Sequence, residues 1–204
     1  MDSRATAKDS AGAALIELAL ALGASAAVLI PTGALAVEDR FAALCAEPHR
    51  CPSYGLAPGC PPHAMRPAAF RELLRRYRQI LVFKIDAPAA ALMGPERLEI
   101  ARRIHCLAAT IEEQALAGGF HLAKGMAAGS CKELFCPEDP ACVVLARALP
   151  CPHAGCARPS ISAVGVDFSR LAVTAGWPFG KIEPGAAATN DSAMGLMAGL
   201  VLLR

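Results

Sequence analysis

The chain has 204 residues, of which 54% are hydrophobic and 19% are charged, and its formal net charge is +2. This composition excludes an intrinsically disordered chain and is sufficient for a domain with a sizeable core. The small net charge gives no reason to expect binding to nucleic acid or to an anionic membrane surface. We therefore expect one domain over residues 1–204 that binds neither nucleic acid nor membrane.

Apolar periodicity and turn residues predict the elements of the first half. Leu15, Leu18 and Leu22 recur at three- and four-residue steps, which is typical of an amphipathic helix. The run ILVFKI is β-branched and aromatic, which favours a strand. The expected elements are a helix over 11–22, a strand over 26–30, a strand with a turn or a short helix over 35–44, a helix over 68–78 and a strand over 80–85.

The second half opens with the clearest helix of the chain. Pro95 suits its first turn, and apolar residues keep helical spacing from Ile100 to Ala115, ahead of two glycines. The elements expected after it are a strand over 120–126, a short helix opening at 160–164, a helix over 167–175, a turn or loop over 181–191 and a strand over 195–203. Because helices alternate with short apolar strands, we predict an α/β fold with helices layered on a mixed, partly parallel sheet.

The segment from Gly129 to Ser160 holds five of the nine cysteines, together with five prolines that break regular structure. Its thiols Cys131, Cys136, Cys142 and Cys151 fall within 21 positions. Four thiolates are the ligand set most typical of iron–sulfur clusters. The gaps are wider than those of bacterial ferredoxins, and the paired C-x2-C spacing of zinc sites is absent. Spacing alone therefore leaves open a four-iron cluster, a zinc ion, or free or bridged thiols.

A second cysteine-rich loop over residues 45–63 carries Cys45, Cys51 and Cys60. Three thiols can hold a cluster with one iron open to a further ligand, or one zinc ion that needs a fourth ligand. His49 and His63 are near enough in sequence to supply that ligand. The loop could also help the first segment complete one shared site, or its cysteines could be structural.

Other chemistry-bearing residues have simpler interpretations. Cys106 lies inside the clearest helix and is interpreted as a packing residue, whereas Cys156 could replace one of the four ligands. His105 is expected on the surface of the same helix, and His121 is expected to be structural. Tyr54 and Trp177 are interpreted as packing aromatics. The arginines of the 68–78 helix form either a solvated face or a docking surface for an acidic redox partner: Arg71, Arg75, Arg76 and Arg78.

The odd number of cysteines prevents complete disulfide pairing. Residues 11–30 are apolar, but Glu17 interrupts the run and the segment before it is not net positive, which is unlike an export signal. We expect a cytoplasmic protein, in which reduced thiols bind metals more often than they form disulfides. A secreted disulfide protein is the weaker alternative.

The run C-x5-CPSYG-x4-CPP from Cys45 to Pro62, preceded by LALGASAAVLI, resembles the predicted metal-binding proteins of domain-of-unknown-function family 2284. The segment from Cys151 to Ser160 is similar to a C-terminal motif of that family, and the resemblance covers about Leu15 to Leu203. Pro152 stands where the family tends to have arginine, and Cys156 is an addition. The resemblance implies metal binding but no reaction, and it implies these ligands: Cys45, Cys51, Cys60, Cys131, Cys136, Cys142 and Cys151.

Taken together, the sequence favours a 4Fe-4S protein that carries electrons or is part of an oxidoreductase, with a redox protein as partner. Cys131, Cys136, Cys142 and Cys151 would bind the cluster, and the 45–63 loop would form a second site. The alternative is a zinc-stabilised interaction module without redox activity, in which metal binding contributes folding energy. No Walker loop, dinucleotide-binding glycine motif or hydrolase motif indicates another enzyme class.

Overall fold

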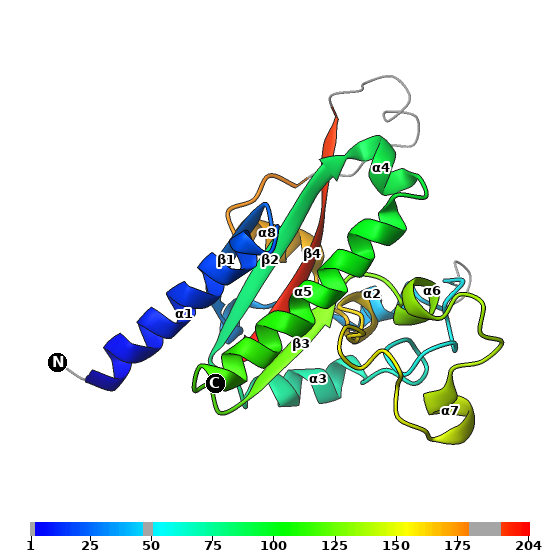
Figure 1. Ribbon diagram of the computed structural model, residues 1–204, viewed down its shortest axis with the longest axis horizontal. Coiled ribbons are helices and arrows are strands. Elements are labelled where there is room, and N and C mark those ends of the chain that lie inside the picture. The colour runs from blue at the N-terminus through cyan, green and yellow to red at the C-terminus, as the bar shows by residue number, and fades with distance from the viewer. Residues whose placement is uncertain (1–2, 47–50, 180–192) are drawn as a thin grey trace.

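A computed structural model describes residues 3–46, 51–179 and 193–204, with side chains from residue 10 onward. Its framework is a four-stranded sheet with helices on both faces (Figure 1). The strands are β1 (Ala26–Pro31), β2 (Gln79–Pro88), β3 (Ala123–Ala127) and β4 (Met194–Leu203). Their order across the sheet is β1-β2-β4-β3, and each neighbouring pair is antiparallel.

The predicted partly parallel sheet is therefore wrong. The helical connection after β2 does lead to a strand that runs in the same direction, β3, because β2 and β3 are both antiparallel to β4. However, β4 comes from the C-terminal end of the chain and lies between them. The crossover unit is thus split by an inserted strand. Helix–strand alternation along the chain indicates the crossover but not the insertion.

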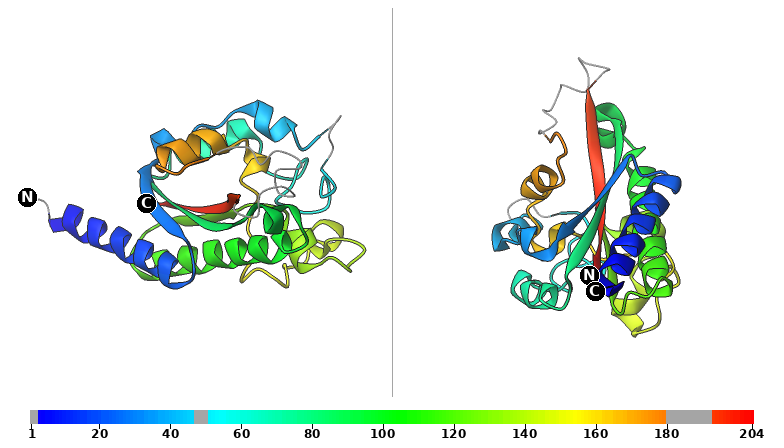
Figure 2. Two further views of the ribbon diagram at one scale, coloured as in Figure 1. Left: turned by 90° about the horizontal axis from the view of Figure 1, so that it is seen from above. Right: turned by 90° about the vertical axis from the view of Figure 1, so that its left-hand side faces the viewer.

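One face of the sheet is covered by α1 (Ser3–Ala21) and α5 (Arg97–Ala117), which lie side by side in Figures 1 and 2. Side chains alternate across a strand, so every second residue of β2 points to this face. Leu81, Phe83 and Ile85 pack there against Ile104 and other apolar residues of α5. This core confirms the predicted helices near residues 11–22 and 100–115.

The opposite face is covered by α3 (Pro67–Leu74), α8 (Phe168–Thr174) and the short 3-10 helix η2 (Ser162–Val164). The alternate residues of the central strands, including Ile80 and Val82, pack against Phe70 and Leu171. Trp177 is buried in the same cluster, which confirms its interpretation as a packing aromatic. The helix expected over 68–78 is real but ends four residues earlier, at Leu74.

Several expected boundaries shift. The ambiguous segment 35–44 contains the short helix α2 (Asp39–Ala43), after the 3-10 turn η1 (Thr32–Ala34). The segment after residue 85 extends β2 to Pro88 and then forms α4 (Ala89–Met93), while β3 begins at Ala123. The predicted loop over 181–191 lies outside the described residues. Among the described helices, none combines the length and the apolar character that crossing a lipid bilayer requires.

Both cysteine-rich segments lie at one end of the molecule, beside the end of β3 (Figures 1 and 2). The segment that follows β3 contains the short helices α6 (Cys131–Phe135) and α7 (Val143–Arg147). The amide of Ser160 donates to the carbonyl of Gly59, so the two segments touch through their main chains. A Cβ atom at Gly59 would lie 2.9 Å from Cα of Pro159, and this close approach therefore requires glycine.

Candidate metal centre

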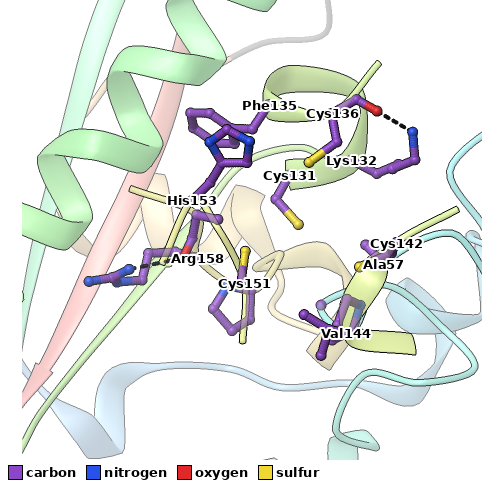
Figure 3. Close-up of a pocket in the computed structure, with 14 residues that line it drawn as sticks. Ala57, Cys131, Lys132, Phe135, Cys136, Cys142, Val144, Cys151, His153 and Arg158 are labelled. Carbon is purple, nitrogen blue, oxygen red and sulfur yellow. Dashed lines mark hydrogen bonds between the residues drawn. The ribbon is translucent and has the colours of Figure 1, made fainter. Parts of the chain in front are cut away.

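Four thiols surround one cavity at this end of the fold. Cys131 begins α6, Cys136 follows its last turn, Cys142 precedes α7, and Cys151 lies on the loop beyond α7. These loop and helix-end positions follow from the prolines and from Gly129, whose φ of 85° turns the chain out of β3. The four cysteines line a cavity of about 270 Å³, with their sulfurs around a common space in Figure 3.

The cavity disfavours free thiolates in the absence of a cation. Burial, together with negative charge on Cys60, Cys151, Cys142 and Cys136, raises the pKa of Cys131 to about 12. Burial also raises the pKa of Cys136, with a contribution from the nearby carboxylate of Asp139. A bound cation would reverse this preference, because it stabilises the deprotonated sulfur directly.

Positively charged and aromatic side chains complete the wall of the cavity (Figure 3). Lys132 is buried, and its Nζ donates to the main-chain carbonyl of Cys136, which ties the ends of α6 together. The ring of His153 stacks on Phe135 with the ring centroids 5.6 Å apart. Arg158, on the loop that follows Cys151, also lines the cavity.

Cys45, Cys51 and Cys60 form a second thiol set around a neighbouring cavity of about 300 Å³. Burial raises the pKa of Cys45, and negative charge on Cys51 and Cys60 raises it further, so the three sulfurs are electrostatic neighbours. The same cavity is lined by the ion pair of Arg97 and Glu133, whose closest atoms are 2.6 Å apart. The second thiol set therefore lines a separate cavity, whose wall also contains charged side chains.

A hydrogen bond through Ser130 links the two thiol sets. Cys60 is buried, and its Sγ donates to Oγ of Ser130 at 3.2 Å. Ser130 immediately precedes Cys131, and negative charge on Cys60 contributes to the raised pKa of Cys131. The seven cysteines that the sequence indicated as candidate ligands therefore line two adjoining cavities, four in one and three in the other.

His105 is buried rather than exposed, so its prediction as a surface histidine is wrong. The amide of Arg158 donates to His105 Nδ1 at 3.0 Å, and Nε2 lies 3.1 Å from the carbonyl of Ala128. Because Nδ1 accepts, the proton resides on Nε2, which donates to Ala128. Burial lowers the pKa of His105 to about 4, so the ring is neutral at ordinary pH. The two hydrogen bonds of His105 therefore attach both ends of the segment 128–158, which carries the four thiols, to α5.

Arg158 reinforces the same attachment. Its Nε lies 2.5 Å from Oε2 of Glu112 on α5, and its Nη1 donates to the carbonyls of Ala154 and Ala157. The loop that carries Cys151 is therefore held in a fixed shape against the helix. A sequence signal for this contact existed in α5: Ala101, His105 and Ala109 recur at four-residue steps and form a second buried stripe.

Cys106 and Cys156 form a disulfide, with Cα atoms 4.3 Å apart. The interpretation of Cys106 as a simple packing residue is therefore wrong, and so is the suggestion that Cys156 replaces a ligand. The two residues are 50 positions apart in sequence, and no local pattern connects them. The remaining seven cysteines are free.

The other candidate residues lie at the margins. His63 is exposed and lines neither cavity, His121 is exposed, and His49 lies outside the described residues. Tyr54 lines the second cavity. In the described part of the chain, no three or more Cys, His, Asp or Glu side chains are gathered closely enough to hold one metal ion.

Comparison with known proteins gives one match. The family model described as predicted metal-binding protein, domain-of-unknown-function family 2284, matches residues 28–203. This range contains all seven free cysteines. No curated protein and no solved structure matches the chain.

Proposed function

The chain belongs to domain-of-unknown-function family 2284, the predicted metal-binding proteins, and we propose that it is an iron–sulfur protein that transfers electrons. Cys131, Cys136, Cys142 and Cys151 hold a 4Fe-4S cluster in this proposal. The observation that carries it is the presence of four free thiols around one cavity of about 270 Å³.

The donor set fits a cluster better than a single ion. A zinc ion needs all four sulfurs about 2.3 Å from one point, whereas each thiolate of a four-iron cluster binds a different iron. The cavity between the four sulfurs supplies space for an inorganic core. The high pKa of Cys131 supports a bound metal of either kind, because this thiol needs a strong cation before it loses its proton.

Cys45, Cys51 and Cys60 hold a second centre in this proposal. Three thiolates leave one metal position for a further ligand, and the neighbouring cavity of about 300 Å³ gives that position space. The hydrogen bond between Cys60 and Ser130 supports a position for this centre beside the first. Two adjoining one-electron centres would suit the passage of electrons through the protein.

The electron donor or acceptor is proposed to be a redox protein. Cys136 and Cys142 are only half-buried, so the first centre lies near the surface, where a partner can approach it. We place this exchange in the cytoplasm, where the seven thiols would remain reduced until they bind metal.

The proposal is tested by purifying the protein without oxygen and measuring its visible absorption, iron, sulfide and zinc. We expect a brown protein that contains iron and sulfide and is bleached on reduction. A colourless, folded protein with stoichiometric zinc would replace this function with that of a zinc-stabilised interaction module.

Three cysteine variants separate the two centres. Cys131→Ser should lose about four irons and keep the remainder, while Cys51→Ser should lose only the second centre. Cys156→Ser is the matched control, because it removes a cysteine of the same segment that lies outside both sets. If either Cys131→Ser or Cys51→Ser loses all iron yet remains folded, the seven thiols form one shared centre.

A further inference from the structure

The Cys106–Cys156 disulfide lies at the edge of the metal-site segment without lining either cavity. It joins α5 to the loop that begins at Cys151, five positions before Cys156. Both of its residues are partly exposed rather than buried in the core. The bond is therefore partly exposed at the level of its residues and separate from the proposed metal ligands.

The seven free cysteines favour a reducing setting. Seven cysteines are free, and they bind a metal only as reduced thiols or thiolates. A disulfide that coexists with such thiols experiences the same reducing conditions. Disulfides in reducing compartments of mesophiles are usually transient, catalytic or redox-sensing rather than structural.

The fold also does not depend on this bond to hold the loop. The amide of Arg158 donates to His105, next to Cys106, and the Arg158 side chain pairs with Glu112 two turns further along α5. On the loop side, the amides of Cys156 and Ala157 both donate to the carbonyl of His153. Opening the disulfide leaves these contacts in place, so the loop can stay on α5 in both redox states.

We propose that Cys106 and Cys156 form a reversible dithiol–disulfide site that exchanges electrons with an external thiol. A thiolate attacks one sulfur of the pair, the bond between the two cysteines breaks, and a mixed disulfide forms. A second external thiolate then attacks the mixed disulfide at the external sulfur. The external thiols leave as a disulfide, oxidised by two electrons, and Cys106 and Cys156 each retain a reduced sulfur that takes up one proton.

The inference of a reducing setting rests on metal binding by the seven free thiols, but the exchange itself needs no metal, so its failure is distinguishable from failure of the proposed iron–sulfur function. The test uses oxygen-free protein with its metal retained, equilibrated with reduced and oxidised glutathione at graded ratios. Differential alkylation and mass spectrometry then give the redox state of each cysteine. The controlling ratio is the squared concentration of reduced glutathione divided by the concentration of oxidised glutathione. As this ratio rises about a hundredfold, the disulfide form of the pair should go from about tenfold excess over the dithiol form to about tenfold deficit.

The reduced protein should keep its far-ultraviolet circular dichroism and its metal content. Parallel equilibration with dithiothreitol distinguishes a pair that accepts a simple monothiol from one that reacts only with a dithiol. A pair that stays oxidised in excess dithiothreitol, or that becomes reduced only when the protein unfolds, would show a structural disulfide. A pair that is reduced in every buffer would overturn the proposal equally.

Single variants test the mixed disulfide directly. Cys106→Ala leaves Cys156 without its partner, and Cys156→Ala leaves Cys106 alone. We expect oxidised glutathione to form one stable adduct at the remaining cysteine in at least one of them, which identifies the accessible sulfur. If neither variant forms an adduct while both remain folded with metal bound, neither sulfur is open to external thiols and the proposal fails.

Discussion

Acidification should destabilise the fold through His105, whose neutral ring bridges Arg158 and Ala128. Burial lowers its pKa from 6.5 to about 4, so between these values the unfolded chain binds a proton that the folded chain excludes. The stabilisation is complete above the unfolded pKa and is lost as the pH falls. At about 1.4 kcal/mol for each pKa unit, the loss approaches about 3 kcal/mol near pH 4.

The assay is urea unfolding at several pH values, with wild type compared against His105→Asn. Asparagine keeps a carbonyl near the position of Nδ1, which can accept from Arg158, but it does not titrate. Contributions from the cysteines and carboxylates are common to both proteins and cancel in the difference. That difference should be nearly constant above about pH 6.5 and shrink below it. If it is the same at pH 7 and pH 4.5, His105 is not held neutral by the fold and the reasoning is refuted.

Three further outcomes are expected from the same end of the molecule. Gly59→Val should push the two cysteine segments apart, because a Cβ at this position would lie 2.9 Å from Pro159. We expect the free energy of unfolding, measured with urea, to fall by about 1–3 kcal/mol, and an unchanged midpoint would contradict the close approach. Arg158→Met should lower the free energy of unfolding by about 2–3 kcal/mol, because it leaves Glu112 without its partner, and Arg158→Lys should lower it less. Equal losses in the two variants would show that the ion pair does not stabilise the fold. Metal binding should release protons and become weaker as the pH falls, because Cys131 is protonated at neutral pH. Calorimetry in buffers of different ionisation enthalpy counts the released protons, and a release of none would contradict the raised pKa of Cys131.

The cysteine sets could be predicted from the sequence because the relevant information is local. Prolines and glycines keep Cys45, Cys51 and Cys60 on one loop, and they do the same for the segment around Cys131. The strands and α5 could also be predicted, because the period of their apolar residues is read within a few turns. These features need no knowledge of which segments meet.

Apart from shifted element boundaries, the errors concern contacts between distant segments. The position of β4 between β2 and β3 depends on pairing across more than 100 residues, which no local pattern encodes. Cys106 and Cys156 are 50 residues apart, and their bond depends on the loop returning to α5. His105 lies on the side of α5 that faces this loop, and it is buried where the loop packs against the helix.

The unequal lengths of the edge strand β3 and its inner neighbour β4 explain why both thiol sets gather at one place. β3 has 5 residues and β4 has 10, and their pairing ends where Ala127 faces Gly199. Beyond Ala127, an edge strand as long as β4 would have continued along the sheet. Instead Ser160 forms a bridge to Ala127, while Ser130 accepts from Cys60. A longer β3 would carry Cys131 along the sheet and away from Cys60, so the early end of this strand is what allows one segment to meet the other.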